Sequence, residues 1–231
     1  MHRVICTATL VLAAGIASAD VFTDDFESGS SAGGWYFIQG GDTIEAGGGN
    51  PGRYLHQPAY DVFAPQARAE GGPFVGDYRA MGVTGIGVDA ITYSRDFGDP
   101  VGFSFSLLLR DTKGTGDFDD DDYAYFVGDQ VPLPGEGWKS YAFDVPSGSD
   151  DTPAGWKGGW AGDGENFRPG VTWGDVVTSV DSVEFWWIDP SYFAFFAFWD
   201  VGIDNASITT IPAPAGLALL GAAGLTMRRR R

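Results

Sequence analysis

The sequence predicts an all-β protein that folds as a single-domain β-sandwich. Two features of the chain carry this prediction. Short runs of alternating apolar and polar residues recur between turn-forming residues, and the 35 glycines and 13 prolines follow no collagen-like period. Only residues 173–180 place apolar side chains at helical spacing. Many short strands joined by turns are the pattern of a sandwich rather than of a helical or α/β protein.

The strongest strand signal lies near the C-terminal end of the chain. Residues 183–188 and 194–208 are rich in aromatic and β-branched side chains, and the turn-forming Asp189-Pro190-Ser191 separates the two runs. Beyond Trp199 the residues alternate, so Val201 and Ile203 face one side of the sheet, and the opposite side takes Asp200, Gly202 and Asp204. We expect the apolar side of this last strand to lie on the core.

Earlier segments alternate in the same way and supply the remaining strands. We expect strands in residues 20–27, 35–38, 43–46, 78–92, 101–110, 123–127 and 138–145. Residues 47–55 are rich in glycine and predict a turn, and residues 146–172 predict a long loop. The GxGxxG-like spacing in the glycine-rich turn has no strand–helix unit around it, so it does not indicate a nucleotide site.

The chain is strongly acidic, with a formal net charge of −17. Five of its 14 basic residues lie in the two terminal segments, so removing these segments leaves nine basic residues against 31 acidic ones, a net charge of −22. Such a surface repels nucleic acid and anionic lipid, and it attracts cations. Solubility is the simpler explanation for the charge.

The N-terminal residues 1–19 have the pattern of a signal peptide. A short basic start is followed by an apolar run from Val4 to Ile16 and by the small residues Ala17-Ser18-Ala19. The single cysteine, Cys6, lies in this segment, so the mature protein would lack disulfides, thiolate metal sites and cysteine nucleophiles. We therefore expect an exported protein whose domain spans residues 20–210.

Residues 211–231 form a tail with a proline motif, an apolar stretch and four terminal arginines. The tail resembles the PEP-CTERM sorting signal that exosortase recognises, although Ala213 stands where that motif has glutamate. The resemblance implies a short hydrophobic sorting helix, transient membrane association, an exosortase-type processing protease as partner, and delivery to the cell envelope, outer surface or extracellular matrix. The residues that carry the signal are Pro212, Pro214, Arg228, Arg229, Arg230 and Arg231.

The body of the chain is similar to exported proteins of that class with a galactose-binding-like or laminin-IV-like jelly roll. The resemblance rests on short segments spread over residues 20–210, which are Gly49-Asn-Pro-Gly52 with Tyr54-Leu55, Phe63-Ala-Pro65, Phe74-Val-Gly-Asp-Tyr78, Gly135-Glu-Gly-Trp138 and Trp199-Asp-Val-Gly-Ile-Asp-Asn205. It implies an antiparallel two-sheet sandwich. Modules of this kind bind glycans or serve as passive matrix components, and the fold alone does not decide between these roles.

The residue types argue against an enzyme. Outside the predicted signal peptide the chain has one histidine, His56, and no cysteine, so the common catalytic triads and histidine-rich zinc sites cannot be assembled. A glycosidase using two carboxylates is the most distant alternative, because among 31 acidic residues some pair always has a suitable spacing.

Calcium is the cofactor that the jelly-roll resemblance implies, because a structural calcium joins the first and last strands in such domains. The ligands would be Asp24, Asp25, Glu27, Asp200 and Asp204, since Ca²⁺ takes six to eight oxygen ligands. The alternative is that these are solvated carboxylates at a sheet edge. Asp117, Asp119 and Asp121 form a second acidic run without the glycine and glutamate of an EF-hand, and a solvated loop explains them better.

Tryptophans in a polar loop indicate a carbohydrate-binding surface. Trp156 and Trp160 are followed by Asp163, Glu165 and Asn166, a set that would combine ring stacking with hydrogen bonds to a polysaccharide. Adjacent strand residues Trp186 and Trp187 face opposite sides of a sheet, so one of the two is expected in the core. Our leading expectation is a non-catalytic structural or adhesive envelope protein, and the alternative is a carbohydrate-binding module.

Overall fold

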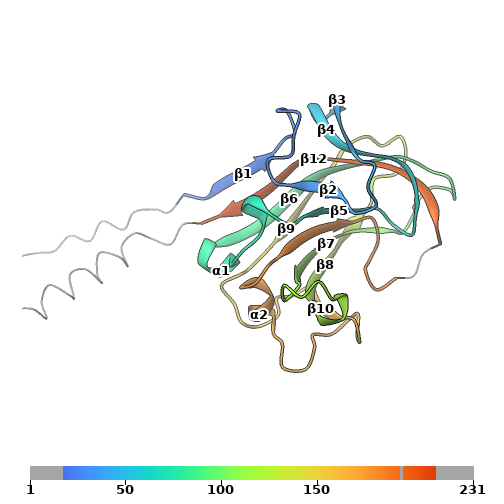
Figure 1. The fold of residues 1–231 in the computed structure, drawn as a ribbon. Coiled ribbons are helices and arrows are strands. Elements are labelled where there is room, and N and C mark those ends of the chain that lie inside the picture. Colours follow the sequence, from blue (N-terminus) through green and yellow to red (C-terminus); the bar gives the residue numbers. More distant parts are fainter. Residues whose placement is uncertain (1–17, 193–194, 212–231) are drawn as a thin grey trace, which may run out of the picture.

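Two antiparallel sheets packed face to face form the body of the protein. The computed structural model describes residues 18–192 and 195–211, and the predicted signal peptide (all but its last two residues) and the sorting residues Pro212, Pro214 and Arg228 to Arg231 lie outside this range. Figure 1 shows the two layers, with the long strand β12 running across one of them. The predicted all-β antiparallel sandwich is confirmed. Within the described residues no helix is long and apolar enough to cross a membrane.

The two sheets, here named sheet A and sheet B, each contain six strands. Sheet A has the order β3 (Thr43–Gly49), β4 (Gly52–Val62), β12 (Ala197–Thr210), β6 (Val83–Arg95) and β9 (Lys139–Asp144), and β1 (Asp20–Asp24) also pairs with β12. Sheet B has the order β10 (Trp156–Trp160), β8 (Asp122–Gln130), β7 (Ser104–Asp111), β11 (Ser182–Trp186), β5 (Gln66–Ala69) and β2 (Trp35–Phe37).

The short helices lie in the connections. They are η1 (Gly72–Phe74), α1 (Tyr78–Met81), η2 (Phe118–Asp120) and α2 (Trp173–Val177). The predicted helix near residue 173 is confirmed by α2, whose N-terminus has a capping box between Thr172 and Asp175. Its side chains Trp173, Val176 and Val177 are fully buried, so the helix closes one end of the sandwich.

The core between the sheets follows from the alternation that the sequence shows. Val201 and Ile203 of β12 are fully buried, as predicted, and Trp187 is the core member of its tryptophan pair. From sheet B, Phe105 of β7 stacks on Phe185 of β11 with ring centres 5.7 Å apart. Because inner and outer side chains alternate, the burial of these residues determines which side chains reach the two outer faces.

Three boundaries differ from the sequence expectation. Residues 47–55 are not a long turn, because β3 runs to Gly49 and β4 starts at Gly52, with φ of +85° at Gly52 closing a tight hairpin. The segment from Tyr78 begins as the helical turn α1, because the Asp77 side chain accepts a hydrogen bond from the Ala80 N–H. Strand β10 lies inside the predicted loop 146–172.

Strand β10 was hidden because it contains two glycines, which weaken a strand pattern. In the structure these glycines make room for aromatic rings that cover the strand. A Cβ at Gly158 would lie 2.3 Å from the Phe167 ring, and a Cβ at Gly159 would lie 2.1 Å from the Tyr123 ring. The strand therefore depends on contacts between distant residues, which periodicity does not reveal.

Candidate functional site

The outer face of sheet B carries polar and aromatic side chains on its central strands. In β7 the side chains of Phe105 and Leu107 point into the core, so Ser106, Leu108 and Arg110 point outward. The register of β11 pairs Ser182 with Arg110 and Glu184 with Leu108, which places the Glu184 side chain on the same outer face. We call this surface face B.

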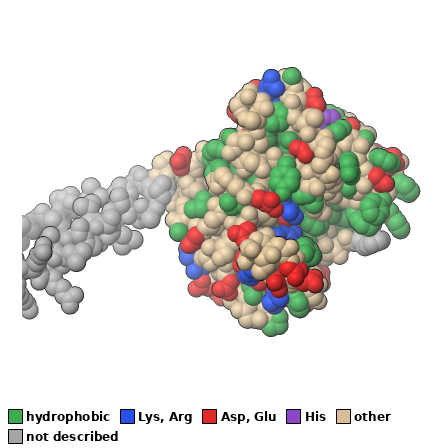
Figure 2. Space-filling model, in the orientation of Figure 1, with side chains coloured by type: hydrophobic (Ala, Val, Ile, Leu, Met, Phe, Trp, Pro, Cys, Tyr) green, Lys and Arg blue, Asp and Glu red, His purple; other side chains and the backbone are tan. Residues whose placement is uncertain are grey.

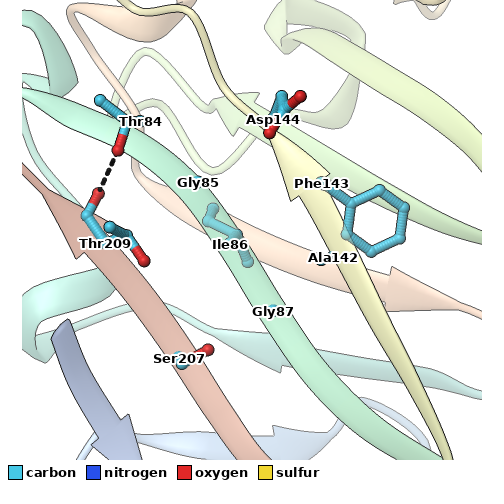
Figure 3. A pocket seen from close by; sticks show the side chains of 9 residues that line it. All are labelled: Thr84, Gly85, Ile86, Gly87, Ala142, Phe143, Asp144, Ser207 and Thr209. Carbon is cyan, nitrogen blue, oxygen red and sulfur yellow. Dashed lines mark hydrogen bonds between the residues drawn. The ribbon is translucent and has the colours of Figure 1, made fainter.

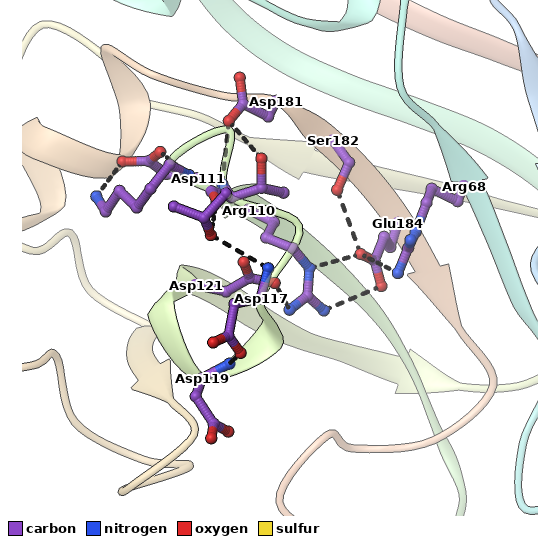
Figure 4. A network of polar contacts seen from close by, with 12 residues as sticks. Arg68, Arg110, Asp111, Asp117, Asp119, Asp121, Asp181, Ser182 and Glu184 are labelled. Carbon is purple, nitrogen blue, oxygen red and sulfur yellow. Dashed lines mark hydrogen bonds and ion pairs between the residues drawn. The ribbon is translucent and has the colours of Figure 1, made fainter.

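Glu184 is the centre of a polar network on face B (Figure 4). Its carboxylate accepts hydrogen bonds from Arg110 Nε at 2.9 Å and from Trp186 Nε1 at 2.7 Å. Arg68 Nη2 lies 3.0 Å from the same carboxylate, and Arg110 Nη1 also donates to Asp121 at 3.0 Å. One carboxylate thus bridges two guanidinium groups from strands β5 and β7.

The electrostatics of this network follow from its burial. Glu184 is fully buried, and although burial alone would raise the pKa of its carboxyl, the Arg110 and Arg68 guanidinium groups hold that pKa below the ordinary value. Burial raises the pKa of Asp121, and Arg110 counteracts this only in part. A buried charge is tolerated only when it is paired and hydrogen-bonded, so the side chains of the network are held in one geometry.

Aromatic rings surround the network. Tyr36 on β2 donates a hydrogen bond from its hydroxyl to Glu70 at 2.8 Å, and Trp186 on β11 remains partly exposed. On the other side Arg110 lies 5.4 Å from the centre of the Tyr123 ring, and Lys157 lies 5.7 Å from that of Tyr125. Face B therefore combines the partly exposed rings of Tyr36, Tyr123 and Trp186 with fixed hydrogen-bonding groups, whereas Tyr125 is fully buried.

Loops border face B on two sides. In the loop before β8, the Phe118 ring lies 5.1 Å from the Arg110 guanidinium. In the loop after β10, Glu165 Oε1 lies 3.5 Å from Lys157 Nζ, and Asp163 contributes to raising the pKa of Tyr123, after the larger effect of burial. Strands position the floor of the face, and these loops form part of its rim.

Some buried polar atoms of face B have no hydrogen-bond partner within the described protein. They include Ser106 Oγ and Arg68 Nε. A buried polar group without a partner costs free energy that a hydroxyl group from solvent or from a ligand would recover. Because these atoms are buried, a ligand reaches them only if the neighbouring side chains move.

The residues that the sequence predicted for glycan binding do not form an exposed tryptophan platform. Trp156 is only 6% exposed, because its ring packs against Trp173 and its Nε1 donates to the Asp144 carbonyl, so this expectation is corrected. Trp160 is half-buried, and the Arg168 guanidinium lies 4.8 Å from the centre of its ring.

Asp163 and Asn166 lie together in the loop at the rim of face B. The Asp163 carboxylate accepts hydrogen bonds from the Glu165 N–H, the Asn166 N–H and the Asn166 side chain. These bonds, the largest of which is that from the Glu165 N–H, lower the pKa of Asp163. In the structure the two residues hold the loop in shape, and their contribution to a ligand remains a prediction.

The outer face of sheet A, here face A, contains a shallow hollow of about 260 Å³. Strands β6, β9 and β12 form it, and Figure 3 shows its floor of Gly85, Gly87, Ala142 and Ser207. The Thr84 hydroxyl donates a hydrogen bond to the Thr209 carbonyl at one end. The small side chains explain why the sheet surface is open here.

Further along face A lies a group of four rings, Tyr54, His56, Tyr93 and Trp138. The centre of the Tyr54 ring lies 5.5 Å from that of His56, 6.0 Å from that of Tyr93 and 5.3 Å from that of Trp138. A Cβ at Gly202 would lie 2.8 Å from the Tyr54 ring, so this glycine lets the ring lie flat on the sheet. We call these residues the aromatic group of face A.

The five carboxylates predicted to bind calcium do not meet at one point. Asp24 accepts hydrogen bonds from Ser31 Oγ at 2.6 Å and the Gly33 N–H at 2.7 Å, and it orders the loop before β2. Asp25 accepts from the Glu27 N–H, and Asp200 is bonded to His56 Nε2 at 2.7 Å. As a set, these five residues do not fit a single calcium site.

Two of the predicted ligands, Glu27 and Asp204, do lie at the same turn. Glu27 accepts from the Arg53 N–H at 2.6 Å, and Asp204 accepts from the Asn50 N–H at 2.6 Å. Burial raises the pKa of Asp204 to about 6, and repulsion from Asp89 and Glu27 adds to it. Among the described residues no three acidic, histidine or cysteine side chains have a metal-binding arrangement, and calcium stays a prediction.

The second acidic run has a structural role. The Asp117 carboxylate accepts a hydrogen bond from the Asp119 N–H and caps η2, and Asp121 pairs with Arg110. Figure 2 shows acidic and basic side chains side by side in the lower part of the molecule, around β10 and α2. The negative charge is therefore locally compensated in this region.

No family model and no curated protein matches the chain. Several solved structures superpose on this chain over most of its length. An exo-beta-agarase structure superposes with a TM-score of 0.44 at 15% identity over 82% of this chain, which spans a quarter (25%) of the agarase chain. A point mutant of a carbohydrate binding module family 29 gives a TM-score of 0.41 at 11% identity, covering 84% of this chain and 94% of that one.

A third similar structure is a family 11 carbohydrate-binding module from Clostridium thermocellum in complex with a β-1,3-1,4-mixed-linked tetrasaccharide. It superposes with a TM-score of 0.40 at 13% identity and covers 89% of this chain and 95% of the module. Likenesses at this level do not by themselves transfer a ligand or an activity.

Proposed function

We propose that this protein is a non-catalytic carbohydrate-binding protein and that a polysaccharide lies on face B. The observation that carries the proposal is the set of partly exposed aromatic side chains, Tyr36, Tyr123 and Trp186, beside the fixed Arg68–Glu184–Arg110 network. Sugar rings offer an apolar face for stacking and hydroxyl groups at their edges. A surface that binds them needs aromatic rings next to rigid polar groups.

The roles of individual residues follow from their positions. Trp186 and Tyr36 offer ring faces, and the partly exposed guanidinium of Arg68 offers a hydrogen bond to a sugar hydroxyl. Glu184 already holds Arg68 and Trp186 in place, so ligand binding costs little side-chain conformational entropy. Rigid strands carry all four residues, and this favours a preformed site.

The charge pairing of face B favours an uncharged polysaccharide. Arg68 and Arg110 are both paired with Glu184, and Lys157 is paired with Glu165. An acidic glycan would meet no unpaired cation among these three residues and would be repelled by a chain of net charge −17. A neutral chain avoids both penalties.

The test is binding of soluble neutral polysaccharides, such as mixed-linkage β-glucan, xyloglucan, glucomannan and agarose oligomers, measured by affinity electrophoresis and titration calorimetry. We expect Trp186→Ala to weaken binding at least about tenfold, through loss of a stacking ring worth about 1.5 kcal/mol. Phe97→Ala is the matched control, because Phe97 is an exposed ring (70%) in the β6–β7 connection, away from the network. Binding of no neutral polysaccharide, or equal binding by Trp186→Ala and the native chain, would overturn the proposal.

Export to the cell surface or matrix suits this function, because polysaccharides of this kind are extracellular. The proposal of export rests on the signal-peptide pattern of residues 1–19 and on the tail of residues 211–231. Exosortase-type processing stays a prediction. A structural or adhesive role, the leading expectation from the sequence, has no supporting observation among the described residues.

A further inference from the structure

The aromatic group of face A is built differently from face B. Tyr54 is the buried centre of the group, while Tyr93 keeps 37% of its surface exposed and His56 and Trp138 are half-buried. The Trp138 indole donates a hydrogen bond to the Gly48 carbonyl at 2.9 Å, which fixes the ring at the margin of the group. The rings are thus held in place, and the three around Tyr54 remain partly accessible.

Two carboxylates stand beside these rings. Asp200 Oδ1 lies 2.7 Å from His56 Nε2, and Glu45 Oε1 lies 3.5 Å from His56 Nδ1. In the described part of the chain, the only ion pairs of Glu45 and Asp200 are with His56. A neutral imidazole leaves both carboxylate charges uncompensated, and a protonated one compensates only one of them.

The charges of Glu45 and Asp200 affect the pKa values of the two tyrosines in the group. Burial is the main reason why the pKa of Tyr54 is raised, and the hydrogen-bonded Tyr93 and the charges of Glu45 and Asp200 add to it. The pKa of Tyr93 is raised as well, chiefly by burial and then by Asp200 and Glu45. The negative potential of the carboxylates therefore covers the exposed ring of Tyr93, and it adds to the negative ring face that attracts cations.

We propose that the aromatic group of face A, with Glu45 and Asp200, is a second ligand site and that it takes an organic cation of the alkylammonium class. The rings supply contact for the apolar substituents around the nitrogen, and the two carboxylates supply the opposite charge. An uncharged ligand of the same shape gains only the contact. The site is separate from the proposed polysaccharide surface, because it lies on the other sheet.

The test compares choline with its uncharged isostere, in which a quaternary carbon replaces the nitrogen, by calorimetry on the full chain. We expect choline to bind at least about fivefold more tightly, since a cation–π contact and a nearby carboxylate each supply about 0.5–1 kcal/mol at an exposed site. Tyr93→Ala and Glu45→Gln are each expected to weaken choline binding about two- to fivefold.

Two controls separate this site from general effects. Tyr60→Ala removes an exposed tyrosine (42%) of β4, and Glu70→Gln removes a carboxylate directly after β5 of sheet B. Both should leave choline binding unchanged. Equal affinity for choline and its isostere would overturn the proposal, as would the absence of choline binding. Full choline binding in the Tyr93→Ala and Glu45→Gln variants would also overturn it. Thermal unfolding of the same variants, measured in parallel, shows whether the chain is folded.

Discussion

The two outer faces of the sandwich carry similar residue types but differ in how their charged side chains are paired. On face B the carboxylate of Glu184 lies between two arginines, and the cations are paired. On face A the carboxylates of Glu45 and Asp200 have only His56 between them. Composition alone, with a net charge of −17, describes neither face. The pairing of charges, rather than their number, separates a surface for neutral ligands from one for cations.

The largest effect is expected from breaking the network of face B. Arg110→Met leaves Asp121 without its ion pair and Glu184 with Arg68 alone, so the free energy of unfolding should fall by about 3–5 kcal/mol. Urea unfolding measures this loss. Arg79→Met is the control: it removes an exposed pair with Asp150 and two hydrogen bonds to the Ser147 and Ser149 carbonyls, and should cost less, about 1–2 kcal/mol. Equal losses in the two variants would show that the network is not a buried structural unit.

The next effect concerns Asp204 and the pH dependence of stability. Its pKa of about 6 in the folded chain lies above the ordinary value of 3.8, so the folded state binds more protons in this window. Stability from this group should therefore fall as pH rises from about 4 to 6, by on the order of 2–3 kcal/mol. Thermal unfolding of Asp204→Asn should lack this dependence. A native chain without any loss of stability across that window would contradict the assignment.

The same variant tests the calcium prediction. If Glu27 and Asp204 bind Ca²⁺, adding it at a hundredfold excess over its dissociation constant should stabilise the native chain by about 2.7 kcal/mol, and Asp204→Asn should lose this gain. An unchanged unfolding temperature with calcium and with a chelator would remove calcium from the account. The charge of Asp204 would then be balanced only by its hydrogen bonds to the backbone.

Salt should change the ligand affinities of the two faces to different extents, and this effect is smaller than those above. Choline binding depends on unpaired carboxylates, so we expect its affinity to fall about two- to fourfold between about 0.05 and 0.5 M NaCl. Binding of a neutral polysaccharide to face B should change less than about twofold over the same range. Calorimetry at the two salt concentrations measures both. An equal salt dependence of the two ligands would mean that charge pairing does not distinguish the faces.

The smallest effect is expected at Trp160, the last residue of β10. Arg168 lies over the Trp160 ring, so Trp160→Ala should weaken polysaccharide binding by less than about threefold, against about tenfold or more for Trp186→Ala. Affinity electrophoresis of the two variants side by side provides the comparison. A larger loss in Trp160→Ala would restore the loop that the sequence indicated as the main binding surface.

The sequence was informative where local alternation determines structure. Val201 and Ile203 were assigned to the core because the period of a strand separates them from Asp200 and Gly202. The short helix from Trp173 was also readable, because its apolar residues follow the helical period. Strand β10 was missed, since Gly158 and Gly159 show no pattern and their neighbours Phe167 and Tyr123 come from elsewhere.

The surfaces proposed for binding could not be predicted in the same way. Face B joins Tyr36, Arg68, Arg110 and Glu184, which lie on four strands and become neighbours only through the register of sheet B. One signal was available in the sequence: Glu184 is a lone carboxylate in an apolar strand, and such a residue requires a buried partner. Trp156, which the sequence placed on the surface, is buried because the inner side of β10 faces Trp173.

The most direct test of the two-face account is a titration of one protein sample with both ligands, a neutral polysaccharide and choline, for the native chain, Trp186→Ala and Tyr93→Ala. We predict that the native chain binds the two ligands independently, that Trp186→Ala weakens only polysaccharide binding and that Tyr93→Ala weakens only choline binding. Competition between the ligands, or loss of the same ligand in both variants, would contradict the separation of the two faces.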